Sequence, residues 1–364
     1  MNILYYYSSQ QVHTGSPQVL LRLIDCLDRE RYRPFFLASQ NGKLCQELKK
    51  KDVEILNCEQ GIVSKRGLFR NIININKIAY LLRINKIDVV HINELGYNFE
   101  LVVAAKMLRI PVILHNHNPA VFSRKNINCL FGDKFIFVSN SLVKECKGSE
   151  MIRNKTEVVY NPIDFDHFSS GKPIRAQLGI EQNQQVVGTI AQICPRKGID
   201  IFIATAEKVA KSLPDARFLI VGPEAIGAEA YAAEMRELIQ RKNLGDTVKF
   251  MGPRNDIPDI LASLDLFFLP SRAEPFGLVL VEAIAAGVPV VASSVGGIPE
   301  IIPTREIGIV KSLEEGAFEE EIVGLLKNEN QRRCHSRHAF RYAYEHFSKD
   351  RFIDGMNAMY QNLV

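Results

Sequence analysis

The chain alternates between short apolar runs and segments whose apolar residues recur every three or four positions. The short runs lack the in–out alternation of a half-exposed strand, so they predict strands buried on both faces. They are residues 3–7, 34–38, 89–92, 112–114, 135–138, 186–190, 218–221, 248–250, 266–269 and 288–292. Helix-like spacing covers residues 19–26, 72–84, 101–108, 201–212, 228–242 and 278–286. This alternation predicts an α/β fold with doubly wound parallel sheets.

The alternation is too long for a single sheet. One doubly wound sheet takes about 150 residues, whereas the chain has 364. We therefore expect two Rossmann-like domains, residues 1–168 and 169–346, divided at the polar stretch 169–173. Residues 347–364 predict a final helix, and its apolar face comprises Phe352, Met356, Met359 and Tyr360. This helix either returns to the first domain or completes the core of the second.

Composition places the chain among globular proteins. Apolar residues make up 46% and charged residues 24%, which excludes disordered and fibrous classes. The longest apolar stretch, residues 283–295, is shorter than the roughly 20 residues of a membrane span. Residues 1–7 lack the basic region of a signal peptide and predict a buried strand. The seven scattered cysteines form no CxxC pair and favour reduced thiols, so we expect a cytoplasmic protein.

The net charge of +4 is spread unevenly, with a basic first half and an acidic second half. This imbalance is too weak to predict nucleic-acid binding, but it suits a surface that approaches an anionic membrane or acceptor. Residues 65–86 contain no acidic side chain, and Arg66, Arg70 and Lys77 lie on one side of the expected helix. Its apolar stripe comprises Leu68, Ile72, Ile75, Ala79 and Leu82. The helix either packs on the first sheet as an ordinary surface helix or also contacts an anionic membrane.

The segment 266–283 carries the most informative chemistry. A buried strand ends at Pro270, a loop bears Glu274, and a helix begins near Gly277. Amides at a helix start have no partner within the helix and, with the helix dipole, favour a phosphate. Glu282 lies one turn further along that helix, among apolar neighbours. Its carboxylate either accepts hydrogen bonds from a ribose diol or pairs with a basic side chain.

The Glu-x7-Glu frame of Glu274 and Glu282 resembles the signature of the retaining family-4 glycosyltransferases of GT-B fold. Further segments resemble the same family in order along essentially the whole chain: residues 88–91, 111–117, 138–140, 161–164, 287–293 and 296–300. The resemblance implies two Rossmann-like domains that face each other across a cleft. It also implies that the final helix crosses back to the first domain.

The resemblance assigns donor-binding roles in the second domain. Glu282 would hold the donor ribose, Glu274 would contact hydroxyls of the transferred sugar, and Lys197 would bind the diphosphate. The helix start comprises Phe276, Gly277 and Leu278. Gln192 occupies the segment where the family usually has an arginine, so either Lys197 carries the diphosphate nearly alone or Arg196 assists it. A lysine and a helix start can neutralise a diphosphate without a metal ion.

In the first domain, Gly15 matches the family's glycine-rich loop, although a simple tight turn remains the alternative. His117 matches a histidine that the family places near the transferred sugar. His115 and His117 alone do not complete a metal site, so no metal is expected. The other histidines considered are His91, expected to be structural, and His335 and His338, expected to be solvated.

The resemblance implies a metal-independent, retaining glycosyltransferase that uses a nucleotide sugar as co-substrate and needs no further cofactor. UDP is favoured over GDP as the nucleotide. The acceptor is expected to be a glycan or lipid-linked glycan of cell-surface polysaccharide synthesis. The alternatives are a GT-B-fold UDP-sugar epimerase and a catalytically silent binding protein. An NAD-dependent dehydrogenase is excluded because no strand is followed by G-x-G-x-x-G.

Overall fold

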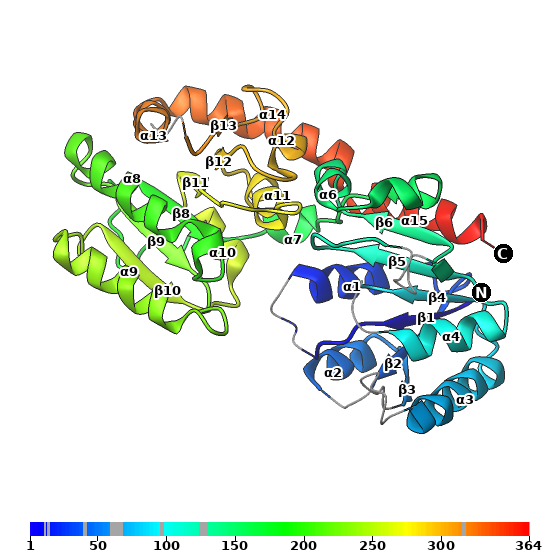
Figure 1. Cartoon of the computed structure of the whole chain (residues 1–364). Helices are drawn as coiled ribbons and strands as arrows, with labels where there is room; N and C mark the ends of the chain where they lie inside the picture. The colour runs from blue at the N-terminus through cyan, green and yellow to red at the C-terminus, as the bar shows by residue number, and fades with distance from the viewer. Residues whose placement is uncertain are drawn as a thin grey trace. The chain divides into compact units, whose positions relative to one another are not determined.

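The chain folds into two compact units, Met1–Pro162 with Lys349–Val364, and Ile163–Ser348 (Figure 1). The computed structural model describes all residues except 11, 13–14, 39–41, 59–67, 95–97, 124–129, 315–317 and 364, and the side chains of residues 68 and 69. Each unit is a parallel sheet with helices between its strands, so the predicted α/β class is confirmed.

The first unit contains a seven-stranded parallel sheet within the described residues, in the order β3-β2-β1-β4-β5-β6-β7. Its strands are β1 (Asn2–Tyr6), β2 (Arg33–Ala38), β3 (Glu54–Asn57), β4 (Val89–Ile92), β5 (Val112–Asn116), β6 (Lys134–Phe137) and β7 (Thr156–Val158). Its helices are α1 (Gly15–Cys26), α2 (Lys43–Lys50), α3 (Leu68–Ile84), α4 (Phe99–Met107), α6 (Asn140–Glu145), the 3₁₀ helix η2 (Ser149–Lys155) and α15 (Lys349–Gln361). The strand order reverses between β1 and β4, and such a switch point forms a ligand crevice at the strands' carboxyl ends.

The second unit has a six-stranded parallel sheet in its described part, in the order β10-β9-β8-β11-β12-β13. The strands are β8 (Val186–Ile190), β9 (Arg217–Val221), β10 (Val248–Gly252), β11 (Leu266–Leu269), β12 (Val290–Ser293) and β13 (Ile309–Lys311). The helices are α7 (Phe165–Ser169), the 3₁₀ helix η3 (Pro195–Lys197), α8 (Ile199–Ser212), α9 (Glu229–Arg241), α10 (Ile257–Ala262), α11 (Leu278–Ala285), α12 (Ile298–Ile301), α13 (Phe318–Lys327) and α14 (Glu329–Phe347). Here the switch point lies between β8 and β11.

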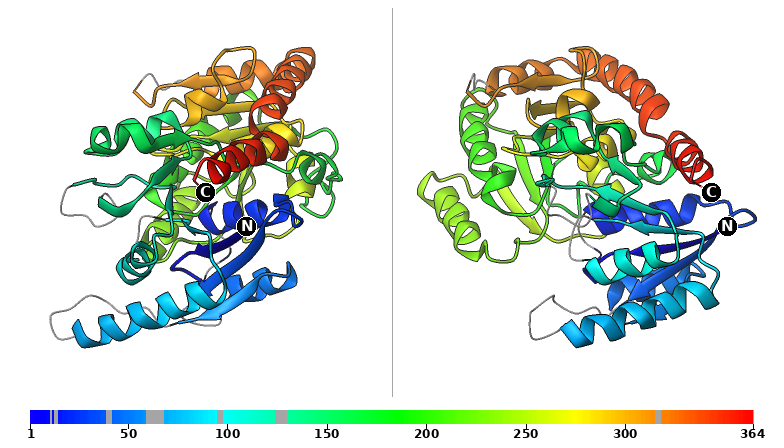
Figure 2. Two further views of the ribbon diagram at one scale, coloured as in Figure 1. Left: turned by 90° about the vertical axis from the view of Figure 1, so that its right-hand side faces the viewer. Right: turned by 45° about the vertical axis from the view of Figure 1, so that its right-hand side comes forward.

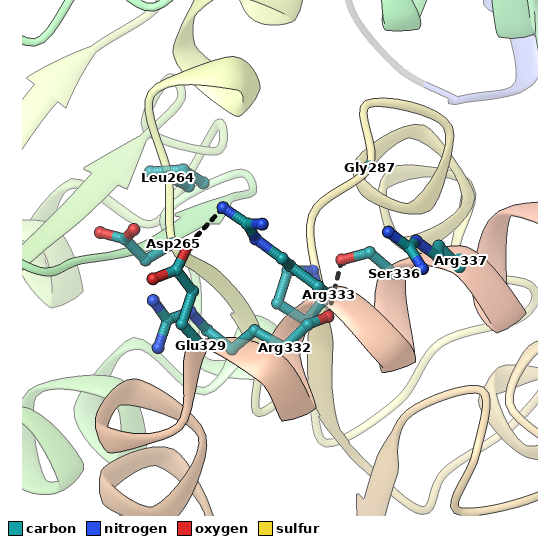
Figure 3. Close-up of a pocket in the computed structure, with 9 residues that line it drawn as sticks. Leu264, Asp265, Gly287, Glu329, Arg332, Arg333, Ser336 and Arg337 are labelled. Atoms are coloured by element: carbon teal, nitrogen blue, oxygen red, sulfur yellow. Dashed lines mark hydrogen bonds and ion pairs between the residues drawn. The ribbon is translucent and has the colours of Figure 1, made fainter.

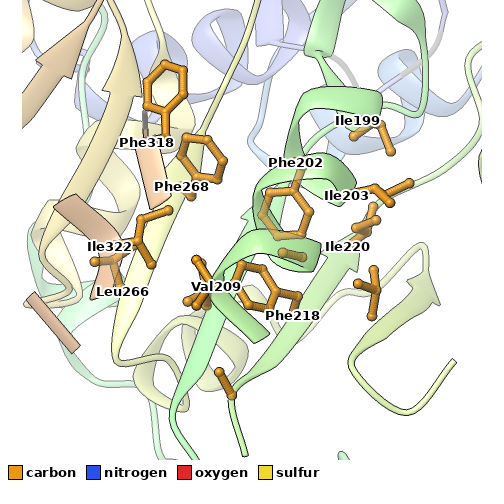
Figure 4. Packing of buried hydrophobic residues seen from close by; sticks show 14 of the residues in the cluster. Ile199, Phe202, Ile203, Val209, Phe218, Ile220, Leu266, Phe268, Phe318 and Ile322 are labelled. Atoms are coloured by element: carbon orange, nitrogen blue, oxygen red, sulfur yellow. The ribbon is translucent and has the colours of Figure 1, made fainter. Parts of the chain in front are cut away.

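Aromatic packing anchors the core of the second unit. Phe202 on α8 stacks on Phe268 of β11 with ring centroids 5.7 Å apart, and it meets Phe218 of β9 edge to face at 5.5 Å. Phe318 of α13 contacts the same Phe268 at 5.1 Å (Figure 4). Because the rings come from helices and strands on both sides of β8, this core fixes the strands whose loops carry the candidate donor residues.

The final helix returns to the first unit. Phe352, Met356, Met359 and Tyr360 of α15 are buried in the same core as residues of β1 and α1. α15 packs against α1, and Figure 2 shows the red final helix beside the dark-blue first helix. The units divide at 162/163 and 348/349, whereas the sequence analysis placed the boundaries at 168/169 and 346/347. The first difference arises because α7 packs against α10 and α11 of the second unit.

The apolar runs predicted from the sequence leave out three short strands, β3, β7 and β13, which have four, three and three residues and lie at sheet edges. The predicted apolar stripe of α3 is confirmed at Leu82, which is buried, but not at its N-terminal end. Ile72, expected on the apolar stripe, is 50% exposed, whereas Asn71 and Asn74 are buried. The reason is a buried carboxylate: Asn74 Nδ2 donates to both oxygens of Glu100 on α4, at 3.2 and 3.3 Å. Lys65 and Arg66 lie outside the described residues.

The expectation that His335 is solvated is also wrong. This side chain is only 8% exposed, because it lies on the buried face of α14 with Ala339 and Ala343 one and two turns further on. Burial lowers the pKa of His335, and the nearby charge of Arg305 lowers it further. His338, three residues along the helix, is exposed as predicted.

Candidate functional site

Two loops at the carboxyl ends of β8 and β11 bring a lysine and a glutamate into contact. Lys197 ends η3, the short 3₁₀ turn after β8, and Glu274 lies in the loop after β11. Lys197 Nζ donates to Glu274 Oε2, and the two side chains are only 11% and 10% exposed. Since a buried ion pair costs desolvation energy, its position at the switch point indicates a binding function.

Three hydrogen bonds hold the Glu274 loop in place. The Ser271 hydroxyl donates to Glu274 Oε2 over 3.5 Å, and the Ser293 hydroxyl donates to the Ser271 carbonyl at 2.5 Å. The Gly297 amide donates to the Glu274 carbonyl at 2.9 Å. The carboxylate is therefore fixed by β12 and the loop after it as well as by its own loop.

A second ion pair joins the two loops from outside. Arg272 donates to both carboxylate oxygens of Asp200, at 2.8 and 2.5 Å, and the Tyr231 hydroxyl donates to the same carboxylate at 2.9 Å. Burial alone would raise the pKa of Asp200, but these donors outweigh it and hold the pKa below its ordinary value. Neither Arg272 nor Asp200 is predicted from the sequence, because Arg272 lies two residues before the Glu-x7-Glu frame and the family resemblance assigns it no role.

Two glycines allow the loops to approach this closely. Gly198 has φ +66°, and a Cβ there would lie 2.0 Å from the Pro270 carbonyl oxygen. Gly296 has φ +52°, and its Cβ would lie 1.9 Å from the carbonyl oxygen of Glu274. Any side chain at either position would push the loop that bears Lys197 or Glu274 out of place.

Helix α11 begins beside the ion pair. Gly277 precedes it with φ +108°, and a Cβ on Gly277 would lie 3.5 Å from Glu274 Cγ. The first amides of α11, from Leu278 onward, point out of the helix end, where they can bind an anion. The Phe276 ring is buried edge to face against Phe347 at 5.6 Å, so only its backbone is suited to a ligand.

The other candidates for donor binding are Glu282, Gln192 and Arg196, and they differ in solvent exposure. Glu282 is half-buried one turn along α11, and Gln192 is half-buried two residues beyond β8. Arg196 is exposed, and its Nη1 donates to the Ala273 carbonyl at 3.3 Å. The second unit thus brings Lys197, Glu274 and the start of α11 together directly.

In the first unit, His117 follows β5 and is tied to the start of α1. Its Nε2 lies 3.1 Å from Asn93 Oδ1, and Asn93 Nδ2 donates to the Ser16 carbonyl at 3.0 Å. Because Asn93 uses its amino group on Ser16, the oxygen faces His117, so Nε2 carries the proton and Nδ1 keeps a lone pair. Gly15, the first residue of α1, is exposed next to Ser16.

Burial lowers the pKa of His117 to about 3, so the imidazole is neutral at physiological pH. Among the described residues there is no group of three His, Cys, Asp or Glu side chains arranged to hold a metal ion. No disulfide joins the cysteines that the structure describes to one another. Asn93 is not predicted as a site residue from the sequence. The one indication is that it directly follows the buried strand β4.

The second unit also has a surface pocket of about 370 Å³, lined by Leu264, Asp265, Gly287, Pro289, Glu329, Arg332, Arg333, Ser336 and Arg337 (Figure 3). Leu264 and Asp265 precede β11 and Gly287 precedes β12, so it lies at the opposite edge of the sheet from Lys197. Arg332 donates to the carbonyls of Leu325 and Leu326 near the end of α13, and Arg333 pairs with Glu329. These guanidinium groups stabilise helix ends, and we do not place the donor here.

Comparison with known families matches both units. The profile "Glycosyltransferase Family 4" matches residues 13–167, and the profile "Glycosyl transferases group 1" matches residues 171–343. The chain belongs to the family-4 glycosyltransferases. Its pair of parallel α/β units is the GT-B fold of these enzymes.

Relatives of this glycosyltransferase include the D-inositol 3-phosphate glycosyltransferase of Segniliparus rotundus, 33% identical over 57% of this chain and 47% of the relative. The alignment spans about half the length of that relative. The N-acetyl-alpha-D-glucosaminyl L-malate synthase of Bacillus anthracis is 26% identical over 79% of this chain and 78% of its own. The structure of Anabaena Alr3699/HepE in complex with UDP and glucose superposes with a TM-score of 0.83 over 99% of both chains at 24% identity, which shows a shared fold.

The glycine at 296 gives a direct test of the site's construction. We expect Gly296→Ala to destabilise the protein by more than the roughly 1–2 kcal/mol that a left-handed backbone costs an ordinary residue, because its Cβ clashes with the Glu274 carbonyl. Gly252→Ala is the matched control, since Gly252 has φ +67° but open space around its Cβ. Urea unfolding measures both variants. Equal losses of unfolding free energy would show that the close approach at Glu274 is unimportant.

Proposed function

We propose that this protein is a retaining glycosyltransferase that moves a sugar from a nucleotide-sugar donor to a hydroxyl acceptor. The observation that carries the proposal is the buried Lys197 beside Glu274 and the start of α11. A lysine and helix-start amides together provide the positive potential that a leaving diphosphate needs. A carboxylate in the same place can accept hydrogen bonds from sugar hydroxyls.

The family resemblance suggests which part of the nucleotide sugar each residue binds. Lys197 binds the diphosphate, Glu274 the hydroxyls of the transferred sugar, and Glu282 the ribose. The backbone of Phe276, Gly277 and Leu278 adds amide donors for the phosphates, and Gln192 and Arg196 extend this region. We favour UDP over GDP, because the structure of Anabaena HepE was determined with UDP and glucose bound.

The transfer is a front-face substitution at the anomeric carbon. The bond between this carbon and the diphosphate oxygen breaks, and the acceptor oxygen bonds to the carbon on the same face. The leaving diphosphate takes the proton of the acceptor hydroxyl, so atoms and charges balance. Lys197 and the start of α11 stabilise the charge that develops on the diphosphate, a task that divalent ions perform in other enzymes.

His117 acts in this proposal as a hydrogen-bonding group rather than as an acid or base. Its pKa of about 3 keeps the ring neutral, and Asn93 fixes the proton on Nε2. The lone pair on Nδ1 is then the available acceptor, which suits a hydroxyl of the transferred sugar. Gly15, at the start of α1, leaves room for a ligand to approach the backbone.

Product analysis of a transfer reaction tests the function and the role of Lys197 together. With a suitable acceptor and excess EDTA, we expect the wild type to release free nucleotide and form an equal amount of product with the donor's anomeric configuration. Lys197→Ala should lose transfer by about a hundredfold or more, because it removes the positive side chain nearest the leaving group. Gln192→Ala should lose much less.

Each contrary outcome is informative. A changed sugar nucleotide would indicate an epimerase, and an unchanged one a binding protein. Activity that vanishes in EDTA and returns with Mg²⁺ or Mn²⁺ would contradict the metal-independent mechanism. Comparable damage from Lys197→Ala and Gln192→Ala would make Gln192 a principal ligand of the diphosphate.

We further propose that the acceptor is a glycan or lipid-linked glycan and that α3 contacts an anionic membrane surface. Ile72, Ile73, Tyr80 and Ile84 of α3 are each at least half exposed, and Lys77 and Arg83 are exposed on the same helix. Apolar and basic side chains together favour the interface of an anionic bilayer. No helix within the described residues is long and apolar enough to span a bilayer.

Vesicle binding tests the membrane contact. We expect the wild type to sediment with vesicles that contain phosphatidylglycerol and not with pure phosphatidylcholine. Ile73→Ser combined with Tyr80→Ser should weaken this binding severalfold, because it removes exposed apolar area that would enter the interface. Met107→Ser, at an equally exposed methionine on α4, serves as the control. Equal binding by all three proteins would exclude α3 as the contact.

A further inference from the structure

The last helix places a hydroxyl group in the centre of the first sheet. The Tyr360 hydroxyl of α15 lies 3.0 Å from the hydroxyl of Tyr5 on β1 and 2.7 Å from Nδ1 of His91 on β4. All three side chains are fully buried. Tyr5 and His91 are direct neighbours in the register of β1 and β4, so Tyr360 bridges two central strands.

From His91, a row of imidazole rings continues to His117. His91 is in register with Ile113 of β5, so His115 and His117, two and four residues further on, follow on the same face of the sheet. The ring centroids of His91 and His115 are 5.5 Å apart, and those of His115 and His117 are 4.3 Å apart in a stacked arrangement. Each ring therefore touches the next.

The middle ring depends on its neighbours for its orientation. Neither nitrogen of His115 has a hydrogen-bond partner among the described residues, and the side chain is completely buried. Among the described residues, its ring contacts are His91 on one side and His117 on the other. The tilt of His115 consequently follows the tilt of His91, which the Tyr360 hydroxyl fixes.

We propose that Tyr360 is a positioning residue for sugar transfer: its hydroxyl orients His91 and, through the stacked ring of His115, the imidazole of His117. The inference rests on the proposed function, in which His117 faces the transferred sugar. Asn93 holds His117 Nε2 from one side, and the imidazole row supports the ring plane from the other. The C-terminal helix thereby contributes to the reaction as well as to the stability of the first unit.

The variant Tyr360→Phe removes the hydroxyl and keeps the ring. We expect kcat to fall about tenfold, because a catalytic group held slightly out of place loses rate. The donor KM should change little, since Lys197 and Glu274 belong to the second unit. Tyr32→Phe is the matched control: its buried ring contacts Tyr360 at 5.5 Å, but no ring or hydrogen-bond contact links it to the three histidines among the described residues.

A double-mutant cycle separates positioning from a general structural effect. In the His117→Ala background, Tyr360→Phe should lower kcat no further, because the group it positions is gone. Equal losses in both backgrounds would overturn the proposal. If His117→Ala itself leaves kcat unchanged, the assigned role of His117 fails and the proposal fails with it. If His117→Ala is damaging and Tyr360→Phe is not, only the present inference fails.

Nuclear magnetic resonance of the histidine rings gives a readout that does not depend on any substrate. Tyr360→Phe should shift the ring ¹H and ¹⁵N signals of His91, His115 and His117, whereas Tyr32→Phe should leave those of His115 and His117 in place. Should Tyr360→Phe reduce the folded fraction, His91→Phe tests the same link from the other end and should lower kcat similarly. Unshifted His117 signals in folded Tyr360→Phe would overturn the proposal.

Discussion

The buried ion pair between Lys197 and Glu274 is the contact around which the second unit is organised. Removing two charges from water is costly, and their mutual attraction compensates only where the geometry is fixed. Here it is fixed by the hydroxyls of Ser271 and Ser293, by the Arg272–Asp200 pair, and by two loops in close approach. Apolar residues in these two positions would stabilise the unit at least as well as the ion pair does. The proposed donor accounts for these charges, because it carries a diphosphate for Lys197 and sugar hydroxyls for Glu274.

In the absence of a ligand, the glutamate serves as the lysine's anionic partner. Under the proposed function, a nucleotide-sugar donor brings its own anion, so its diphosphate would compete with Glu274 for Lys197. Glu274 is then available for sugar hydroxyls, for which a carboxylate is a strong acceptor. In the proposed function, the same two side chains thus stabilise each other in the structure and would each contact the donor when it binds.

The sequence predicts the α/β architecture and the strand-end positions of Lys197 and Glu274 well, because both follow from local patterns. Doubly buried strands such as β8 and β11 are continuous apolar runs, and the Glu-x7-Glu frame fixes the spacing of a loop and a helix start. The sequence-based predictions are wrong or incomplete where two interacting side chains come together only in the folded chain. Asn74 faces inwards because Glu100 of another helix is buried there, and Arg272 finds Asp200, which lies 72 positions away. No periodicity in the sequence shows that the Tyr360 hydroxyl meets His91, although the apolar face of α15 was visible.

The most direct measurement of the central claim is the affinity of UDP, with GDP in parallel, for the Glu274→Gln variant by calorimetry. Glutamine keeps the shape of the side chain but gives up the charge that competes for Lys197. We expect UDP to bind at least as tightly as to the wild type, while sugar transfer becomes slower because the carboxylate that accepts sugar hydroxyls is lost. A large loss of UDP affinity in this variant would contradict the account, because it would mean that the diphosphate does not replace Glu274 at Lys197.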